Sequence, residues 1–341
     1  MERKNHNLLT VAVLFIFCLL LFSQCFQGGG GRLQGSTGKT NEMILITNAG
    51  TSSGAITDTV KTFFSQNDLY LPQPEALYDV FTVAQQDLNS QTTIKRHHNI
   101  LIINVSDTIK ESVLAKKDLW ASPQLVVYFN ATSDTAFYRL FRAYRRTIME
   151  KFDHNELLRA RNLTDFGKNV GLSNDILQQF NLNIPIPAGF QVARKEPDFL
   201  WLTQRSNRKN EDMTASIMIW QRPYTAELQF STDSMILDRN QVGRLYISGP
   251  TAGSYMKTAT SYLRPQTEII SDYATDFAIE MRGLWELEGD FMGGPFISYT
   301  FVHPKTQQLI TIDAFLYHPN HDKRPLLRQL QSIITNVSIP E

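Results

Sequence analysis

The sequence predicts a mixed α/β protein (α+β class) made of two α/β layers, the C-terminal one an antiparallel sheet with helices packed on one face. In the first half of the chain, short apolar runs alternate with stretches of helical periodicity, which is the pattern of an α/β layer. In the second half, two groups of three strand-like runs are each followed by a helix, and the loops 289–294 and 304–308 are of hairpin length. With 42% hydrophobic residues in 341, the chain can bury a substantial core.

The first domain is expected over residues 42–165. Its strands are placed where the chain is continuously apolar or partly alternating, and its helices where apolar residues recur at spacings of three and four. The expected strands are 43–47, 77–83, 100–105 and 125–129, and the expected helices are 55–64 and 133–161.

The second domain is expected over residues 166–341, and it opens with a helix that ends near Phe180. Two prolines within 184–190 then break the helical periodicity. The expected strands are 191–194, 199–204, 216–221, 277–288, 295–303 and 309–317, and the expected helices are 234–246 and 323–335. This order loosely resembles the photosystem-assembly (PsbP-like) α/β/α sandwich, a similarity of fold alone.

The charge balance argues against nucleic acid as a partner. The 33 Lys and Arg residues are matched by 33 Asp and Glu, so the formal net charge is zero, whereas phosphate binding needs a basic surplus. Both cysteines lie within the first 25 residues, so the folded part can hold no disulfide and no cysteine-based zinc site. No cofactor and no metal are expected.

The N-terminus reads as an export signal over residues 1–24. Arg3 and Lys4 form a positive region, and the 15 residues 8–22 are apolar apart from one threonine. Because a membrane-spanning helix needs roughly 20 apolar residues, a signal peptide is the better interpretation. Cys25 follows, and residues 26–41 are rich in Gly, Ser, Thr and Gln, as in a flexible tether.

A cysteine at the end of an apolar region, with a glycine-rich segment behind it, resembles a bacterial lipobox. This resemblance implies that Cys25 becomes the acylated N-terminus of a lipoprotein, carrying fatty acids such as palmitate, and that the membrane is a partner through this lipid. Phe26 in place of an aspartate resembles sorting to the outer membrane. The alternative is a signal peptide, cleaved or uncleaved, without a lipid.

Four phrases resemble an uncharacterised family of Bacteroidota envelope lipoproteins, a domain of unknown function. The phrases are EDM at 211–213 with SIMIW at 216–220, GPTAGSYM at 249–256, RGLWELEGDFMGGPF at 282–296, and KR at 323–324 with LLRQL at 326–330. Weaker similarity extends to 38–46 and 75–105. The resemblance implies a cell-envelope location and no particular chemistry.

Two serine motifs are candidate catalytic elements. Residues 50–54 fit G-x-S-x-G between an expected strand and helix, which would make Ser52 a nucleophile. No base is marked out for it, and a small-residue turn that caps the helix is the preferred interpretation. Ser254 and Lys257 fit S-x-x-K, but the accompanying S-D-N and K-T-G tripeptides do not occur in the sequence.

Histidines offer a possible metal site at His318 and His321, with Asp313 and Asp322 nearby in sequence. A solvated turn is preferred, because Pro-Asn between the two histidines favours turns. The neighbouring His97 and His98 precede a strand, where adjacent side chains are expected to diverge.

Four sites fit the Asp-(Ser/Thr)-aliphatic pattern that Bacteroidota use for O-glycosylation of exported proteins. Their hydroxyl residues are Thr59, Thr108, Thr135 and Ser234. The alternative is that Asp and Ser/Thr pairs begin helices here, as they commonly do.

The strand 277–290 carries the candidate binding site. Alternation places Glu286, Glu288 and Asp290 on one face with Arg282, and like charges about 6.6 Å apart raise one another's pKa unless a cation lies between them. The binding residues proposed on this basis are Tyr255, Arg282, Trp285, Glu286, Glu288 and Asp290.

The turn 290–295 that follows is expected to be ordered, with the 249–256 loop as its opposite wall. Glycines 289, 293 and 294 permit unusual backbone conformations or the close approach of another chain.

Two classes of function remain. The preferred one is a lipid-anchored envelope module that binds or scaffolds, with an envelope protein or a glycan as its partner. The alternative is an envelope hydrolase that uses Ser52 or the row Glu286, Glu288 and Asp290.

Overall fold

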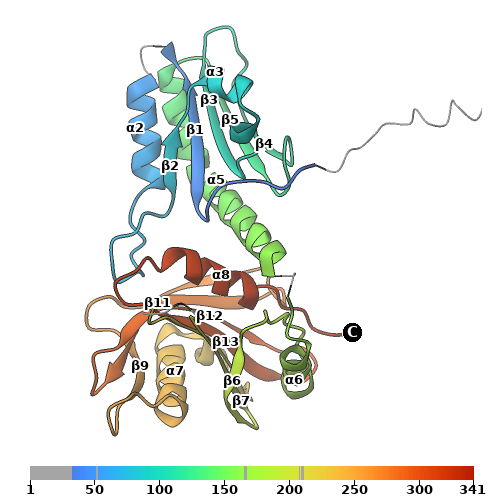
Figure 1. Cartoon of the computed structure of the whole chain (residues 1–341), viewed down its shortest axis with the longest axis vertical. Helices are drawn as coiled ribbons and strands as arrows, with labels where there is room; N and C mark the ends of the chain where they lie inside the picture. The colour runs from blue at the N-terminus through green and yellow to red at the C-terminus, as the bar shows by residue number, and fades with distance from the viewer. Residues whose placement is uncertain (1–32, 51–52, 165–166, 207, 209–210) are drawn as a thin grey trace, which may run out of the picture. The chain divides into compact units, whose positions relative to one another are not determined.

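The computed structural model describes residues 33–50, 53–164, 167–206, 208 and 211–341. The predicted signal peptide, Cys25 and Ser52 lie outside the described residues. Two separate β-sheets organise the described chain, and helices cover both of them (Figure 1). The fold class expected from the sequence, a mixed α/β protein with an antiparallel C-terminal sheet, is confirmed.

The N-terminal layer is a five-stranded sheet in the order β2-β1-β3-β5-β4. The first four strands in this order run parallel, and β4 is an antiparallel edge. The strands are β1 (Glu42–Asn48), β2 (Asp79–Thr82), β3 (Asn99–Val105), β4 (Ser112–Lys117) and β5 (Leu125–Ala131). The helices are α2 (Ser53–Phe64), α3 (Gln85–Ser90), α4 (Thr92–Lys95) and α5 (Asp134–Thr164).

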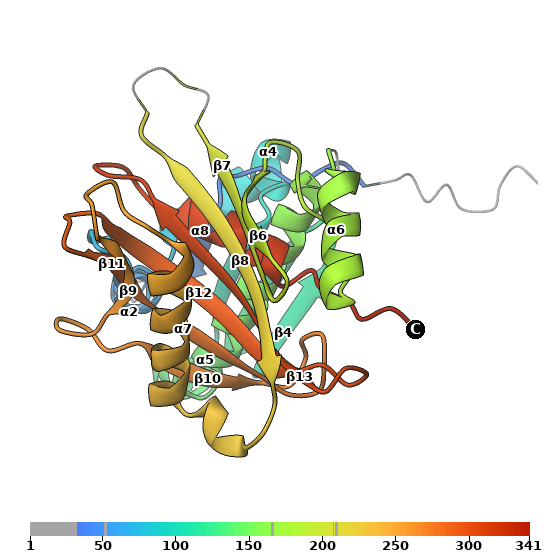
Figure 2. The ribbon, with the colours of Figure 1, turned by 90° about the horizontal axis from the view of Figure 1, so that it is seen from below.

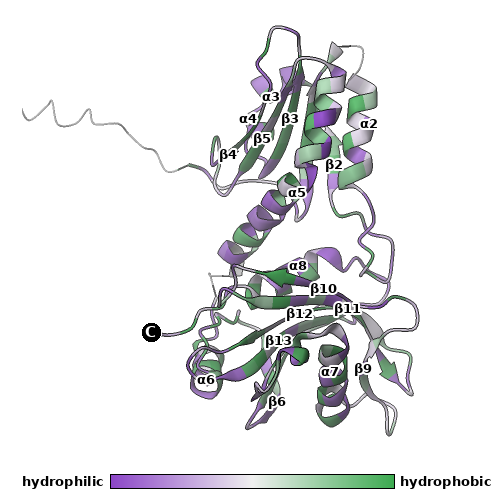
Figure 3. Cartoon of the chain, turned by 180° about the vertical axis from the view of Figure 1, so that it is seen from behind, coloured by the Kyte–Doolittle hydropathy of each residue, from purple (hydrophilic) through white to green (hydrophobic). Residues whose placement is uncertain are grey.

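Both faces of the sheet are buried at β1, β3 and β5, which explains why these strands read as continuous apolar runs (Figure 3). One face packs on α2 and α5 through Phe64, Phe141 and Phe152. The other face packs on α3 through Leu88.

The C-terminal layer is an eight-stranded antiparallel sheet, in the order β10-β11-β12-β13-β8-β7-β6 with β9 also paired to β11. The strands are β6 (Gln191–Glu196), β7 (Phe199–Arg205), β8 (Thr214–Pro223), β9 (Tyr255–Ala259), β10 (Gln266–Ile270), β11 (Ala278–Glu288), β12 (Gly293–Val302) and β13 (Gln308–Tyr317). The helices are α6 (Val170–Phe180), the short 3₁₀ helix η3 (Glu227–Phe230), α7 (Thr232–Tyr246) and α8 (Arg324–Ile334).

Helices cover both faces of this sheet, which corrects the expectation that they pack on one face. Strand β8 shows the division: Ile217 and Ile219 face the cluster that contains α6 and α8, whereas Met218 and Trp220 face the cluster that contains α7. Figure 2 shows α7 lying across the strands on the face toward the viewer. The antiparallel strands are therefore apolar on both sides, as the sandwich arrangement requires.

A buried ion pair attaches α7 to the sheet. Arg239 of α7 and Asp313 of β13 are both fully buried, and their Nε and Oδ2 atoms lie 2.8 Å apart. The guanidinium also donates to the Thr258 hydroxyl of β9 at 3.3 Å and lies 3.8 Å from the centroid of the Phe296 ring. Burial raises the pKa of Asp313, and Arg239 opposes this rise. Neither charge has a path to water, so each depends on the other.

Replacing Arg239 with leucine should lower the free energy of unfolding by about 3–5 kcal/mol, because Asp313 is left buried without its cation. The double variant Arg239→Leu/Asp313→Leu should recover most of this loss. Urea denaturation followed by tryptophan fluorescence measures the effect. Lys195→Leu, which breaks an exposed ion pair with Asp175, is the matched control and should cost less than about 1 kcal/mol. Equal losses for the two single variants would refute the dependence.

Candidate functional site

The hairpin of β11 and β12 and the neighbouring strand β9 bring three of the six predicted binding residues together with Lys257. In the ladder, Glu286 stands opposite Gly293 of β12 and opposite Lys257 of β9, and Glu288 stands opposite Tyr255. Side chains directly opposite one another in an antiparallel pair share a face. Tyr255, Lys257, Glu286 and Glu288 therefore form one surface at the end of the hairpin.

Lys257 is the cation that the carboxylate row requires. Its Nζ lies 3.4 Å from Glu286 Oε1 and also hydrogen-bonds to Glu288. The hydrogen bond to Glu288 raises the pKa of Lys257, and Glu286 adds to the rise. All three side chains are between a third and half exposed, so water screens these pairs and each stabilises the fold only slightly.

The alternation in the sequence predicts that Asp290 continues the row formed by Glu286 and Glu288. It does not, because β11 ends at Glu288. Gly289 adopts a positive φ of 78° and turns the chain. Asp290 then accepts hydrogen bonds from the Thr251 hydroxyl (2.6 Å), from the Thr251 amide (3.3 Å) and from the Phe291 amide (2.7 Å). These bonds, that of the Thr251 hydroxyl first, lower the pKa of Asp290. The 249–256 loop is the opposite wall of the turn, as expected.

The aromatic ring of Phe291 is fully exposed at the tip of this turn, whereas Met292 beside it packs partly against the α7-side core. The two following glycines allow close approach of neighbouring chains. A Cβ on Gly294 would lie 2.0 Å from the carbonyl oxygen of Leu316, and one on Gly293 would lie 2.8 Å from that of Trp285. The turn is thus held by side chain and backbone contacts on both sides of an aromatic tip.

Trp285 and Arg282, also predicted as binding residues, have structural partners. Trp285 is buried, donates its indole N–H to the Leu316 carbonyl at 3.2 Å and packs edge-on against Phe315. Arg282 hydrogen-bonds to Glu280, which is also buried and accepts from the Tyr299 hydroxyl. Tyr255 lies under the Arg244 guanidinium of α7, 5.5 Å from the ring centroid.

The catalytic alternatives find few partners in the described part of the chain. Ser53, next to the undescribed Ser52, accepts a hydrogen bond from the Ala49 amide, as in a turn before a helix. In the S-x-x-K motif, Ser254 donates to the Thr251 carbonyl, and Lys257 holds the two glutamates.

The residues of the possible histidine metal site, in β13 and the turn after it, do not all come together. His318 and His321 stack with ring centroids 4.5 Å apart, and His318 Nε2 lies 3.3 Å from Glu211. Asp313 is taken by Arg239 and so does not join them.

The four predicted O-glycosylation residues lie in different surroundings. Thr108 is exposed in the loop after β3, and Thr135 is exposed in the first turn of α5. Thr59 is half-buried and donates to the Ala55 carbonyl within α2. Ser234 is half-buried and bonds to Ser231, which caps α7. Accessibility favours Thr108 and Thr135.

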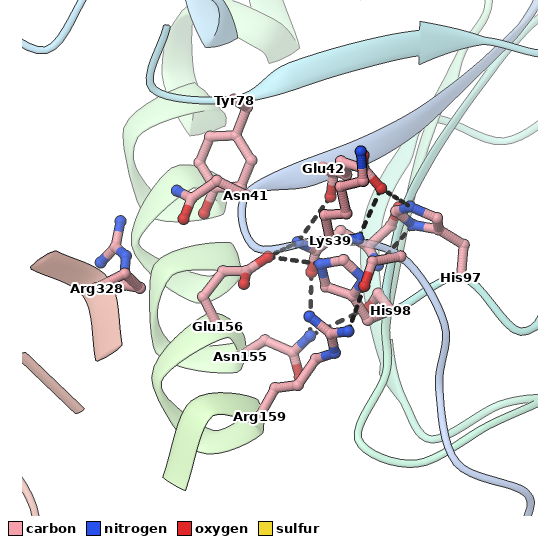
Figure 4. A network of polar contacts seen from close by, with 12 residues as sticks. Lys39, Asn41, Glu42, Tyr78, His97, His98, Asn155, Glu156, Arg159 and Arg328 are labelled. Atoms are coloured by element: carbon pink, nitrogen blue, oxygen red, sulfur yellow. Dashed lines mark hydrogen bonds and ion pairs between the residues drawn. The ribbon is translucent and has the colours of Figure 1, made fainter. Parts of the chain in front are cut away.

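A buried polar network in the N-terminal layer was missed in the sequence, and Figure 4 shows it from close by. His98 is fully buried, and its Nε2 lies 2.6 Å from Glu156 Oε1 while its Nδ1 lies 2.7 Å from the Thr37 carbonyl oxygen. Asn99 donates to the same Glu156 oxygen at 2.6 Å, and Asn155 donates to Asn99 at 3.0 Å. The network joins α5 to the amino end of β3 and to the segment that precedes β1.

The contacts of His98 affect the pKa of Glu156 within this network. Burial would raise the pKa of Glu156, but the hydrogen bond and charge of His98 outweigh burial and lower it. An ionised carboxylate and a carbonyl oxygen both accept hydrogen bonds. Each ring nitrogen of His98 therefore lies beside an acceptor within the network.

His97 stacks on His98 with ring centroids 4.6 Å apart, so the two side chains do not diverge as expected. The reason is that His97 lies in a turn, its amide bonded to the Ile94 carbonyl, and not in the extended strand. Burial lowers the pKa of His97 to about 4, and the positive charges of His98 and Arg159 act in the same direction, against Glu156.

The matches to protein families divide the chain between its N-terminal and C-terminal layers. Residues 36–164 match the model of a domain of unknown function (DUF8532), and residues 169–336 match that of a second domain of unknown function (DUF4837). A search of the curated proteins finds no match.

Among solved structures, the chain is similar to LpqN of Mycobacterium tuberculosis, described as involved in cell envelope biogenesis (11% identity, 47% of this chain, 83% of that chain, TM-score 0.28). It is also similar to the Ran-binding protein Mog1p of Saccharomyces cerevisiae (10% identity, 47% and 90% coverage, TM-score 0.28). Similarities at this level carry no argument about function.

His97 should make the fold sensitive to acid. In the unfolded chain its pKa is the ordinary 6.5, and in the folded chain it is about 4, so the unfolded state binds more protons between these values. The contribution of His97 to the free energy of unfolding should therefore fall by about 2 kcal/mol from pH 7 to pH 5. Comparing urea denaturation of the wild type and His97→Gln at both pH values measures this contribution. His321→Gln, an exposed histidine, serves as the control, and an equal pH dependence in all three proteins would contradict the prediction.

Proposed function

We propose that the chain is an exported, lipid-anchored protein of the cell envelope, and that its folded part is a module that binds a partner protein. The export signal, Cys25 and the glycine-rich segment of the sequence support the envelope location. No helix within the described residues is long and apolar enough to cross a membrane. A lipid on Cys25 would then be the attachment to the outer membrane.

The observation that carries the binding function is the fully exposed ring of Phe291 on a turn held by the hydrogen bonds of Asp290. Burying a phenylalanine side chain is favourable by about 1.5–3 kcal/mol, so leaving it in water forgoes that stabilisation. Asp290 and Thr251 fix the turn, and Gly289 sets its direction. A pre-ordered aromatic residue loses little conformational freedom on binding, which is a property of interface anchors.

The surface around Phe291 indicates the chemistry of the partner. Glu286, Glu288 and Asp290 carry three carboxylates, and Lys257 supplies one ammonium, so the surface beside the ring is acidic. The partner proposed is a protein that offers an apolar pocket rimmed by lysines or arginines.

The alternative of a hydrolase based on the carboxylate row receives little support. Lys257 already pairs with Glu286 and Glu288, and Asp290 bonds to Thr251 instead of facing them. Both glutamates of the row are engaged by the same lysine.

Attachment through Cys25 is tested by labelling. The Cys25→Ala variant should lose incorporation of an alkyne fatty acid and move from the membrane to the soluble fraction, because the thiol that takes the lipid is gone. Cys18→Ala, which changes the other cysteine of the signal region, is the matched control and should keep both properties. Labelling that survives in Cys25→Ala would refute lipidation at this residue.

Binding at Phe291 is tested by site-specific crosslinking in intact cells. A photoreactive benzophenone amino acid at position 291 should give one discrete adduct with a second protein, since the ring lies in the proposed interface. The same amino acid at Tyr262, whose side chain is 91% exposed, is the matched control and should not give that adduct. Asp290→Ala, which releases Thr251, should weaken the adduct at 291. The same adducts from both positions, or none from 291, would refute the interface.

A further inference from the structure

A polar pocket of about 550 Å³ lies in the C-terminal layer, where α6 and β8 end and β7 and β13 begin. Four glutamines contribute to its wall: Gln178 and Gln179 from α6, Gln221 from β8 and Gln308 from β13. Asn181 and Thr306 extend it. We refer to it as the amide pocket. Its volume is within the range of small-molecule sites.

Several of these side chains have hydrogen-bonding capacity that the protein does not use. Within the described part of the chain, the side chains of Gln178, Gln308 and Thr306 have no hydrogen-bond partner. Gln179 donates from its nitrogen to the carbonyls of Glu196 (2.6 Å) and Pro197 (3.1 Å), and its buried oxygen has no donor among the described residues. A buried acceptor without a donor is unfavourable.

The two charged groups of the pocket already have partners within the protein. Asp198 accepts from the Gln221 side chain at 3.0 Å, and Arg222 is bound to Asp238 of α7. What remains for a ligand is therefore a set of uncharged amides, one hydroxyl and the carboxylate of Asp198, which keeps its negative charge. Each carboxamide presents both donors and an acceptor, and a hydroxyl does the same.

We propose that the amide pocket binds a neutral oligosaccharide. Sugar hydroxyls donate and accept at once, which matches carboxamides better than it matches fixed charges. An acetamido substituent would add a paired amide-to-amide hydrogen bond with a glutamine. This inference goes beyond the proposed protein partner, because the residues that line the pocket are distinct from those around Phe291 and either site can fail alone.

The experiment titrates the mature chain with chitotriose, maltotriose and inorganic phosphate by calorimetry. The amide resonances of the glutamine side chains are followed by NMR in parallel. Chitotriose should bind saturably with a dissociation constant near about 1 mM, maltotriose more weakly, and phosphate should not bind. The double variant Gln178→Leu/Gln308→Leu should weaken chitotriose binding by roughly tenfold, since two hydrogen-bonding groups are lost.

Neither Gln178 nor Gln308 forms a side-chain hydrogen bond with the described residues, so their replacement breaks no such contact. Gln191→Leu, an exposed glutamine of β6 that does not line the pocket, is the matched control and should bind like the wild type. Equal melting temperatures would show that all variants fold. Absence of saturable binding by either trisaccharide, equal affinity in the double variant, or binding of phosphate in their place would overturn the inference.

Discussion

The buried ion pair between Arg239 and Asp313 is the contact on which the geometry of the C-terminal layer depends. Arg239 fixes α7 to the sheet through Asp313, and its hydrogen bond to Thr258 fixes β9 at the same time. Helix α7 then lies so close to β9 that a Cβ at Gly243 would come within 2.1 Å of a backbone oxygen. Because β9 carries Lys257, the acidic surface beside the hairpin is positioned through this pair of charges. An apolar substitute could fill the space, but it could not hold a helix and two strands by directed bonds.

The strands that could be predicted are those whose burial leaves a pattern in the sequence. β3 and β5 are buried on both faces and read as continuous apolar runs, and β11 to β13 are flanked by turns that the glycines and prolines mark. The strands β4, β9 and β10 were not predicted. Each lies beside a longer strand at the margin of its sheet, and β4 and β10 are exposed along most of their length. These strands are therefore defined by hydrogen bonding to the neighbouring strand and not by a hydrophobic pattern in the sequence.

The site was predicted less completely, because its polar residues depend on partners that are distant in sequence. In the sequence, Lys257 stands out only as part of the S-x-x-K motif, and its position between two glutamates follows from β9, a strand that was itself not predicted. A signal for the buried network did exist. Asn155 and Glu156 follow Phe152 by three and four positions, which places them on the buried face of α5 and requires partners inside. Those partners, at positions 37, 98 and 99, could not be identified without the sheet.

The segment before β1 also determines how the folded part responds to mechanical force. Gly35 and Thr37 form parallel bridges to Ser122 and His97, and backbone hydrogen bonds of 2.8 to 3.2 Å hold this segment along the sheet. A pull on the chain ahead of Gly35 would load these hydrogen bonds before it reaches β1. The bond from Arg159 to the Gly38 carbonyl passes part of that load to α5. Tension on this end is therefore received by the segments that lead into β3 and β5 and by α5, the longest helix of the N-terminal layer.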